Sequence, residues 1–175
     1  MKKIILFFSL LIFISLVVII LFVHTDPVKF NTITLEEKFS ISIPEYLFRT
    51  DSIDRNALIQ YKNEKKQLFL LAYEKKDTLR SSLEVLFKNA SDDLISKIGN
   101  AQLIKYYPKK INLHKAVIGN IRGAVNETGV YYRIAIIADS SRYYEIIAGT
   151  TENNLSNFSQ DIDSMLDSFT PLLLK

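Results

Sequence analysis

The strongest constraint on this chain is an uninterrupted apolar segment of twenty residues, 4–23, which reads IILFFSLLIFISLVVIILFV. It contains no charged residue. Its polar members are Ser9 and Ser15, whose hydroxyl groups can hydrogen-bond to the backbone of their own helix. A helix of this length spans about 30 Å, the thickness of the hydrocarbon core of a bilayer. The segment therefore predicts one N-terminal transmembrane helix that contacts the lipid bilayer.

Two lysines, Lys2 and Lys3, precede this segment, and positive charges tend to stay on the cytoplasmic side of a membrane. We therefore expect a cytoplasmic N-terminus and an extracytoplasmic domain. The apolar run is longer than that of a cleavable signal peptide, and Val23 and Thr25 do not form a small-residue cleavage site. These features favour a retained signal-anchor. Cleavage, which would release a secreted domain, is the alternative.

The remainder of the chain has the composition of one folded domain. Beyond residue 23 there are 152 residues (175 − 23), with 20 basic (22 − 2) and 19 acidic side chains. This balance gives no general attraction for nucleic acid. No cysteine is present, which excludes disulfides, thiolate nucleophiles and cysteine metal sites. We expect a short tether at 24–29, where Pro27 blocks helix continuation, and one domain at 30–175.

Alternation of polar and apolar residues predicts antiparallel strands along most of this domain. The strands are expected at residues 30–35, 39–43, 57–61, 67–73, 101–107, 116–126, 130–138 and 142–150. The strand at 130–138 is apolar on both faces, which is typical of a central strand covered on both sides. Asp139, Ser140 and Ser141 are expected to form the turn that follows it.

Two segments show the three- and four-residue spacing of apolar side chains that is typical of amphipathic helices. The first is 78–98, with Asp77 as its expected N-cap and Gly99-Asn100 as its stop signal. The second is 152–168, which Pro171 is expected to end. The order of strands, helix, strands and helix indicates an α+β fold, an antiparallel sheet flanked by helices.

The segment FSISIPEYL at residues 39–47 resembles the opening strand of PsbP-like domains, in which a tryptophan follows the proline. Leu47 occupies the position of that tryptophan. The closing hairpin and the helix that ends at Ser168-Phe169 are similar as well, so the resemblance covers residues 30–170. It implies an antiparallel sheet flanked by helices and a binding or assembly role. It brings no catalytic motif onto this chain.

One basic and aromatic segment stands out as a possible contact for anionic surfaces. It consists of Lys105, Tyr106, Tyr107, Lys109 and Lys110, with Pro108 between them. Tyrosine rings can lie at a membrane interface while ammonium groups meet phosphates. The alternative is a solvated turn at the end of a strand, where lysines keep a sheet edge soluble.

Residues with catalytic or metal-binding spacing were not found. His24 and His114 lie far apart in the sequence, and Asp163 and Asp167 are expected on a solvated helix face. We therefore expect no enzyme activity, no metal and no cofactor.

Together these features predict a membrane-anchored, extracytoplasmic binding or assembly module with an envelope protein as its partner. The alternative is a domain that binds a small ligand or anionic lipid headgroups. An enzyme would need acids such as Asp139 or Glu145 to converge in a pocket.

Overall fold

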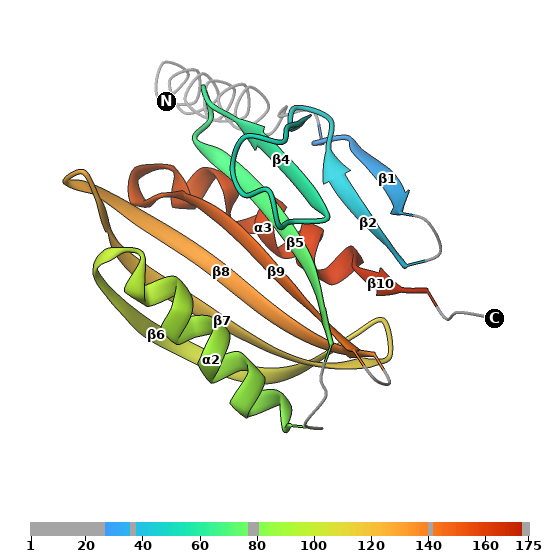
Figure 1. Cartoon of the computed structure of the whole chain (residues 1–175). Coiled ribbons are helices and arrows are strands. Elements are labelled where there is room, and N and C mark those ends of the chain that lie inside the picture. The colour runs from blue at the N-terminus through green and yellow to red at the C-terminus, as the bar shows by residue number, and fades with distance from the viewer. Residues whose placement is uncertain (1–26, 36–37, 77–80, 140–141, 173–175) are drawn as a thin grey trace, which may run out of the picture.

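The computed structural model describes residues 27–35, 38–76, 81–139 and 142–172. The predicted transmembrane helix at 4–23 lies outside these residues, and no helix within them is long and apolar enough to cross a bilayer. The described part of the chain forms two antiparallel sheets and two α-helices, α2 (Leu83–Ser96) and α3 (Leu155–Ser168) (Figure 1). The α+β class expected from the sequence is confirmed.

Seven strands form the large sheet in the spatial order β3-β4-β5-β9-β8-β7-β6. β8 and β9 lie at its centre, as their apolar faces predict, and they pair Ile134 with Ile147 and Ala135 with Ile146. The strands are β3 (Phe48–Arg49), β4 (Ile59–Asn63), β5 (Leu68–Lys76), β6 (Gly99–Ile111), β7 (His114–Val125), β8 (Thr128–Asp139) and β9 (Arg142–Thr151).

The small sheet joins the beginning of the domain to its end. Its strands are β1 (Phe30–Leu35), β2 (Phe39–Pro44) and β10 (Thr170–Pro171), in the order β1-β2-β10. Alternate residues of β2 are buried, as the sequence pattern predicts: Phe39, Ile41 and Ile43. The backbone N–H of Ser42 donates a 2.8 Å hydrogen bond to the hydroxyl of Ser168 at the end of α3.

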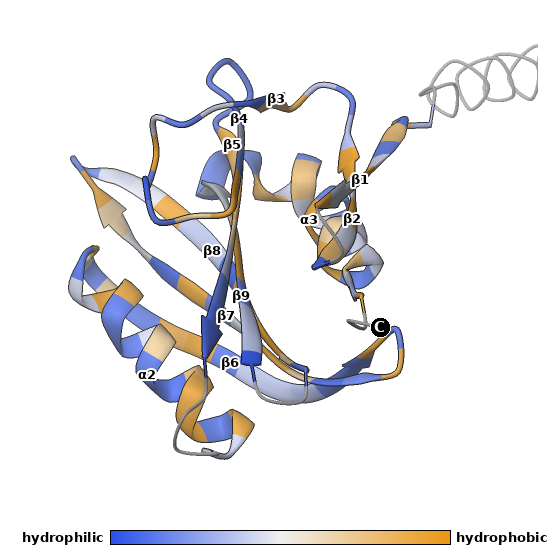
Figure 2. Ribbon diagram, turned by 45° about the vertical axis from the view of Figure 1, so that its right-hand side comes forward, coloured by the Kyte–Doolittle hydropathy of each residue, from blue (hydrophilic) through white to orange (hydrophobic). Residues whose placement is uncertain are grey.

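The helices cover opposite faces of the large sheet (Figure 1). α2 packs on β6, β7 and β8, where Phe87 and Ala90 join the buried residues Ile121 and Ile134. On the other face, α3 and the small sheet enclose the main core. Phe39 and Phe169 stack there with their ring centroids 4.8 Å apart. Figure 2 shows hydrophobic and hydrophilic residues alternating along α2.

The first helix is shorter than its sequence pattern indicates. It begins at Leu83 with Ser82 as its N-cap, because the Ser82 hydroxyl accepts a hydrogen bond from the N–H of Val85. Asp77, the expected cap, lies outside the described residues and is too far upstream to cap a helix that starts there. At the other end the helix stops at Ser96, and the expected stop residues, Gly99 and Asn100, already belong to β6.

Two prolines lie in strands that the sequence pattern did not include. Pro108 was expected in a turn but lies within β6, and the hairpin turn is formed instead by Asn112 and Leu113, whose φ angles are 44° and 73°. Pro171 was expected only to end α3 but forms part of β10. Both strands lie at sheet edges, where the N–H that proline lacks has no partner strand to meet.

Candidate functional site

A groove runs beside α2 across the part of the large sheet that α2 leaves uncovered. It consists of two adjoining cavities of about 420 and 280 Å³, which share Ile53, Phe69 and Tyr132. We call it the α2-side groove. One wall is the C-terminal half of α2, and the other is the loop between β3 and β4. The floor comes from β5, β9 and β8, which lie side by side in the sheet.

An aromatic pair forms the apolar part of the floor. Phe69 of β5 and Tyr132 of β8 lie with their ring centroids 5.6 Å apart. A Cβ atom at Gly149 of β9, the strand between them, would lie 2.5 Å from Phe69 and 2.6 Å from Tyr132. The missing side chain at Gly149 therefore lets the two rings meet above β9. Both rings are half-buried and face the groove.

A charged pair forms the polar part of the floor. Glu145 of β9 is only 3% exposed, and its carboxylate accepts a hydrogen bond from the ammonium group of Lys75 of β5. Burial opposes the charge of Lys75, but the hydrogen bond and the negative charge of Glu145 outweigh it and raise the pKa of Lys75. Lys75 therefore keeps its positive charge at neutral pH and gives the groove a fixed ammonium group.

A hydrogen bond connects the rim of the groove to this floor. The hydroxyl of Tyr73 on β5 donates a 3.0 Å hydrogen bond to Asp54 of the β3–β4 loop. Asp54 also accepts a 2.9 Å hydrogen bond from the backbone N–H of Asn56. That backbone bond, helped by Tyr73 and by the positive charge of Lys97, holds the pKa of Asp54 below its usual value although burial opposes it. Burial and the bond to Asp54 raise the pKa of Tyr73.

One buried amide shapes the β3–β4 loop. The side-chain oxygen of Gln60 on β4 accepts hydrogen bonds from the backbone N–H groups of Ile53 (2.9 Å) and Asp54 (3.0 Å). Its amide nitrogen donates to the carbonyl of Asp54. Gln60 is itself buried, so its orientation is fixed by the fold. The loop is thus held over the groove by a side chain from the sheet.

The five residues expected to contact an anionic surface all lie in β6, but they do not form one patch. On the α2 face, the ring of Tyr106 stacks on Phe87, with ring centroids 5.4 Å apart. On the other face, Lys105 lies over the ring of Tyr107, and Lys109 pairs with Asp167 of α3 at 2.7 Å. Lys110 is exposed near the end of the strand. The alternation of a strand therefore divides these side chains between its two faces.

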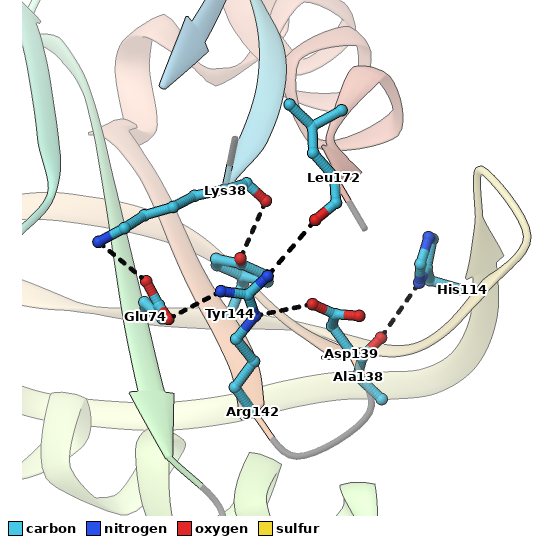
Figure 3. A network of polar contacts seen from close by, with 8 residues as sticks. All are labelled: Lys38, Glu74, His114, Ala138, Asp139, Arg142, Tyr144 and Leu172. Carbon is cyan, nitrogen blue, oxygen red and sulfur yellow. Dashed lines mark hydrogen bonds and ion pairs between the residues drawn. The ribbon is translucent and has the colours of Figure 1, made fainter. Parts of the chain in front are cut away.

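The acids considered for catalysis do not come together. Glu145 lies in the α2-side groove, whereas Asp139 accepts a 2.8 Å hydrogen bond from Arg142 in a separate network (Figure 3). Arg142 also contacts Glu74 at 3.1 Å and the carbonyl of Leu172 at 3.4 Å. This network joins β5 and the β8–β9 hairpin to the chain after β10. The network therefore has a structural role, because it holds these segments of the fold together.

The remaining candidates among the described residues also have local structural partners, whereas His24 lies outside the described residues. His114 is placed in β7, with its Nδ1 atom 3.3 Å from the carbonyl oxygen of Ala138 (Figure 3). Asp163 pairs with Arg133, and Asp167 pairs with Lys109. Within the described residues, no group of histidines and acids has the arrangement of a metal site.

The groove itself was missed in the sequence. One signal for it was available: Glu145 is a charged residue inside the apolar strand at 142–150, where a buried charge needs a partner. Identification of that partner as Lys75 required the pairing of β5 with β9, which the sequence pattern did not provide.

The arrangement of strands and helices is the PsbP-like fold, which confirms the resemblance noted in the sequence. No family model matches this sequence, and no curated protein sequence matches it either. The evidence for the fold therefore comes from solved structures, with sequence identity near 10%.

Three of these structures illustrate the similarity. Cyanobacterial PsbP (CyanoP) from Synechocystis sp. PCC 6803 aligns with a TM-score of 0.65 and 10% identity, over 85% of this chain and 95% of CyanoP. The Ran-binding protein Mog1p of Saccharomyces cerevisiae aligns at 0.60 and 9%, over 83% and 97%. LpqN, involved in cell envelope biogenesis of Mycobacterium tuberculosis, aligns at 0.60 and 10%, over 86% and 88%.

Proposed function

We propose that this chain is a membrane-anchored, extracytoplasmic binding or assembly module that receives its partner in the α2-side groove. The observation that carries the proposal is the groove, which has an aromatic floor at one end and a buried ion pair at the other. Sites that bind other molecules commonly combine an apolar lining with a few fixed polar groups. The apolar segment at 4–23 supports the anchoring.

The chemistry of the groove favours an elongated occupant with both apolar and polar parts. Apolar groups would pack on Phe69 and Tyr132, and hydrogen-bonding groups would reach Lys75 and Glu145. The charged groups are already paired, as Lys97 with Asp93 also is at 2.7 Å, so the occupant needs no net charge. An extended segment of an envelope protein has these properties. Catalysis is not part of the proposal, because each acid of the groove is held by a local partner.

The names of two structural neighbours agree with such a role. Mog1p is described as Ran-binding, and LpqN as involved in cell envelope biogenesis. For this chain these names support a binding or assembly role and leave the partner open.

Site-specific photo-cross-linking tests the proposal. A benzophenone amino acid at Ile53, which is 39% exposed at the rim of the groove, is placed in the full-length chain in its native membranes. The matched control carries the same group at Val125, which is 41% exposed at the end of β7 and outside the groove. We expect an adduct of defined mass from position 53 alone. No adduct from position 53, or the same adduct from both positions, would contradict the proposal.

The alternative function, binding of anionic lipid headgroups, has one structural observation in its favour. Tyr106 is largely exposed on the edge strand β6, and Lys105 and Lys110 of the same strand are exposed as well. An exposed tyrosine ring and exposed ammonium groups on one edge strand fit the interface of an anionic bilayer.

A further inference from the structure

The described residues include four strands at sheet edges, and three of them are protected against pairing with another chain. An open edge presents unpaired N–H and C=O groups, which natural proteins shield with short strands, proline, lysine or bulges. β3 and β10 have two residues each, and β10 contains Pro171. β6 is long, but it carries Pro108, three lysines and two interruptions of its register with β7. β1 has none of these features.

The composition of β1 favours strand pairing. Its six residues, FNTITL, include no charge, no proline and no glycine. Thr32, Ile33 and Thr34 are β-branched, a side-chain type enriched in strands. Within the described residues β1 pairs with β2 alone, so one of its two sides is open.

The hydrogen bonds of β2 show which backbone groups of β1 face the open side. The N–H of Glu45 donates to the carbonyl of Lys29 at 2.9 Å, so Lys29 directs its backbone groups toward β2. The N–H of Ser42, which lies opposite Thr32, points away from β1 to Ser168. The direction of these groups alternates along a strand. The residues whose N–H and C=O groups face outward are therefore Phe30, Thr32 and Thr34.

We propose that β1 is a strand-pairing surface and that its partner is β1 of a second copy of this chain. Two-fold antiparallel pairing about Thr32 places Thr32 opposite Thr32 of the second copy, and Phe30 opposite Thr34. The Phe30–Thr34 pair occurs twice, once in each direction, so there are three pairs in all. Each of them exchanges two backbone hydrogen bonds. The strand carries no charge that would repel its copy, and a threonine pair is favourable across strands. The surface is separate from the α2-side groove.

A second copy fits this edge better than a foreign strand. Isologous pairing covers the open edges of both copies at once, and it gives the closed two-fold symmetry that is commonest among soluble oligomers. A foreign strand would cover β1 but would leave its own second side open. A pair of six-residue strands makes a small interface, so we expect a weak dimer that forms at about 10–100 µM protein.

Cysteine cross-linking tests both the surface and its register. The chain has no native cysteine, so Thr32→Cys in the full-length protein provides the only thiol. In the proposed register the two thiols lie directly opposite each other, and we expect a disulfide-linked dimer under mild oxidation. Thr34→Cys is the matched control on the same strand. It faces Phe30 of the second copy and should remain monomeric under the same conditions.

A proline substitution tests whether the outward N–H groups carry the dimer. Thr32→Pro removes an N–H that no strand of the fold uses, so the fold should persist, as circular dichroism would show, while the non-covalent dimer is lost in a light-scattering concentration series. If this variant misfolds, Thr32→Lys provides a second test, because like charges would then meet at the centre of the pairing.

A wild-type protein that stays monomeric up to about 1 mM overturns the proposal. Equal cross-linking of both cysteine variants, or a dimer that survives at Thr32→Lys, overturns it as well. A monomer that captures a strand of another protein at β1 would assign the edge to that protein and overturn self-pairing.

Discussion

The hydroxyl of Tyr73 donates a 3.0 Å hydrogen bond to Asp54 and so connects the floor of the α2-side groove to its rim. The pKa of Asp54 is lowered in the folded protein, so this carboxylate stabilises the fold above its unfolded pKa of about 3.9. That contribution is lost as the pH falls through the lowered folded value. Folding stability should therefore decrease below about pH 4, partly through Asp54.

Tyr73→Phe removes one of the bonds that hold this pKa down. We expect the pKa of Asp54 to rise toward its ordinary value, although the bond from Asn56 remains, and we expect its stabilising effect at pH 7 to shrink. An NMR titration of the Asp54 carboxyl carbon measures the change. Tyr106→Phe, at an exposed ring on β6, is the control that should leave Asp54 unaltered. An unchanged titration in Tyr73→Phe would mean that the hydroxyl bond has no effect on this carboxylate.

Lys75→Met leaves the buried carboxylate of Glu145 without its ion-pair partner. Loss of one partner of a fully buried pair costs about 3–5 kcal/mol. Because the side chain of Lys75 is 42% exposed, we expect a smaller loss of about 1–3 kcal/mol in the free energy of unfolding. Urea unfolding at pH 7 measures it. The double variant Lys75→Met, Glu145→Gln removes the unpaired charge and should recover part of the loss. No recovery would mean that the loss does not come from the unpaired carboxylate of Glu145.

Ile136→Ala tests the assignment of the central strand. Ile136 is completely buried on the α2 face of β8, so the substitution should lower the free energy of unfolding by about 2–5 kcal/mol. Val85→Ala, on the exposed side of α2, is the control and should change it by less than about 0.5 kcal/mol. Thermal and urea unfolding provide the measurement. Equal effects at the two sites would contradict the described packing.

The apolar segment at 4–23 predicts a protein that stays in the membrane after alkaline carbonate extraction. Since Lys2 and Lys3 favour a cytoplasmic N-terminus, protease added from outside should reach the domain and not the first residues. N-terminal sequencing of the mature chain tests retention directly. A mature protein that begins between Val23 and Phe30 would show that the segment is a cleaved signal.

The alternative lipid function predicts that the protein binds anionic vesicles more tightly than neutral ones, most clearly at low salt. Lys105→Glu with Lys110→Glu should abolish that preference. Lys109 is left unchanged, because its pair with Asp167 joins β6 to α3. Lys65→Glu, an exposed lysine in the β4–β5 turn, controls for net charge. Cosedimentation with vesicles measures binding, and equal binding to both kinds of vesicle would exclude a lipid contact here.

Local patterns were sufficient to predict the α+β class and the positions of most strands and of both helices. Alternation placed β1 and β2 correctly, and apolar residues on both faces placed β8 at the centre of the sheet. The beginning of α2 was wrong because an apolar stripe does not show which residue caps a helix. Here the cap is Ser82, close to the first apolar turn.

The candidate site could not be predicted in the same way, because it depends on strand neighbours that are distant in the sequence. Phe69 and Tyr132 meet only because β9 pairs with both β5 and β8. The role of Gln60 depends on burial, which the polar sequence around the β3–β4 loop does not reveal. The lysines and tyrosines of β6 looked like one patch because a sequence does not show how a strand divides neighbouring side chains between two faces.

The hydrogen bond between the backbone of Ser42 and the hydroxyl of Ser168 has a consequence for biosynthesis. β2 leaves the ribosome well before its neighbours on that side, the end of α3 and β10, because Ser42 and Ser168 are 126 residues apart in the chain. Until then, the apolar residues of β2 lack much of the surface that covers them. The nascent domain therefore exposes the apolar residues of β2 until α3 and β10 have left the ribosome. Its folding completes only after that point. In the domain that follows the apolar segment at 4–23, we therefore expect chaperones that bind extended apolar strands to act on β2.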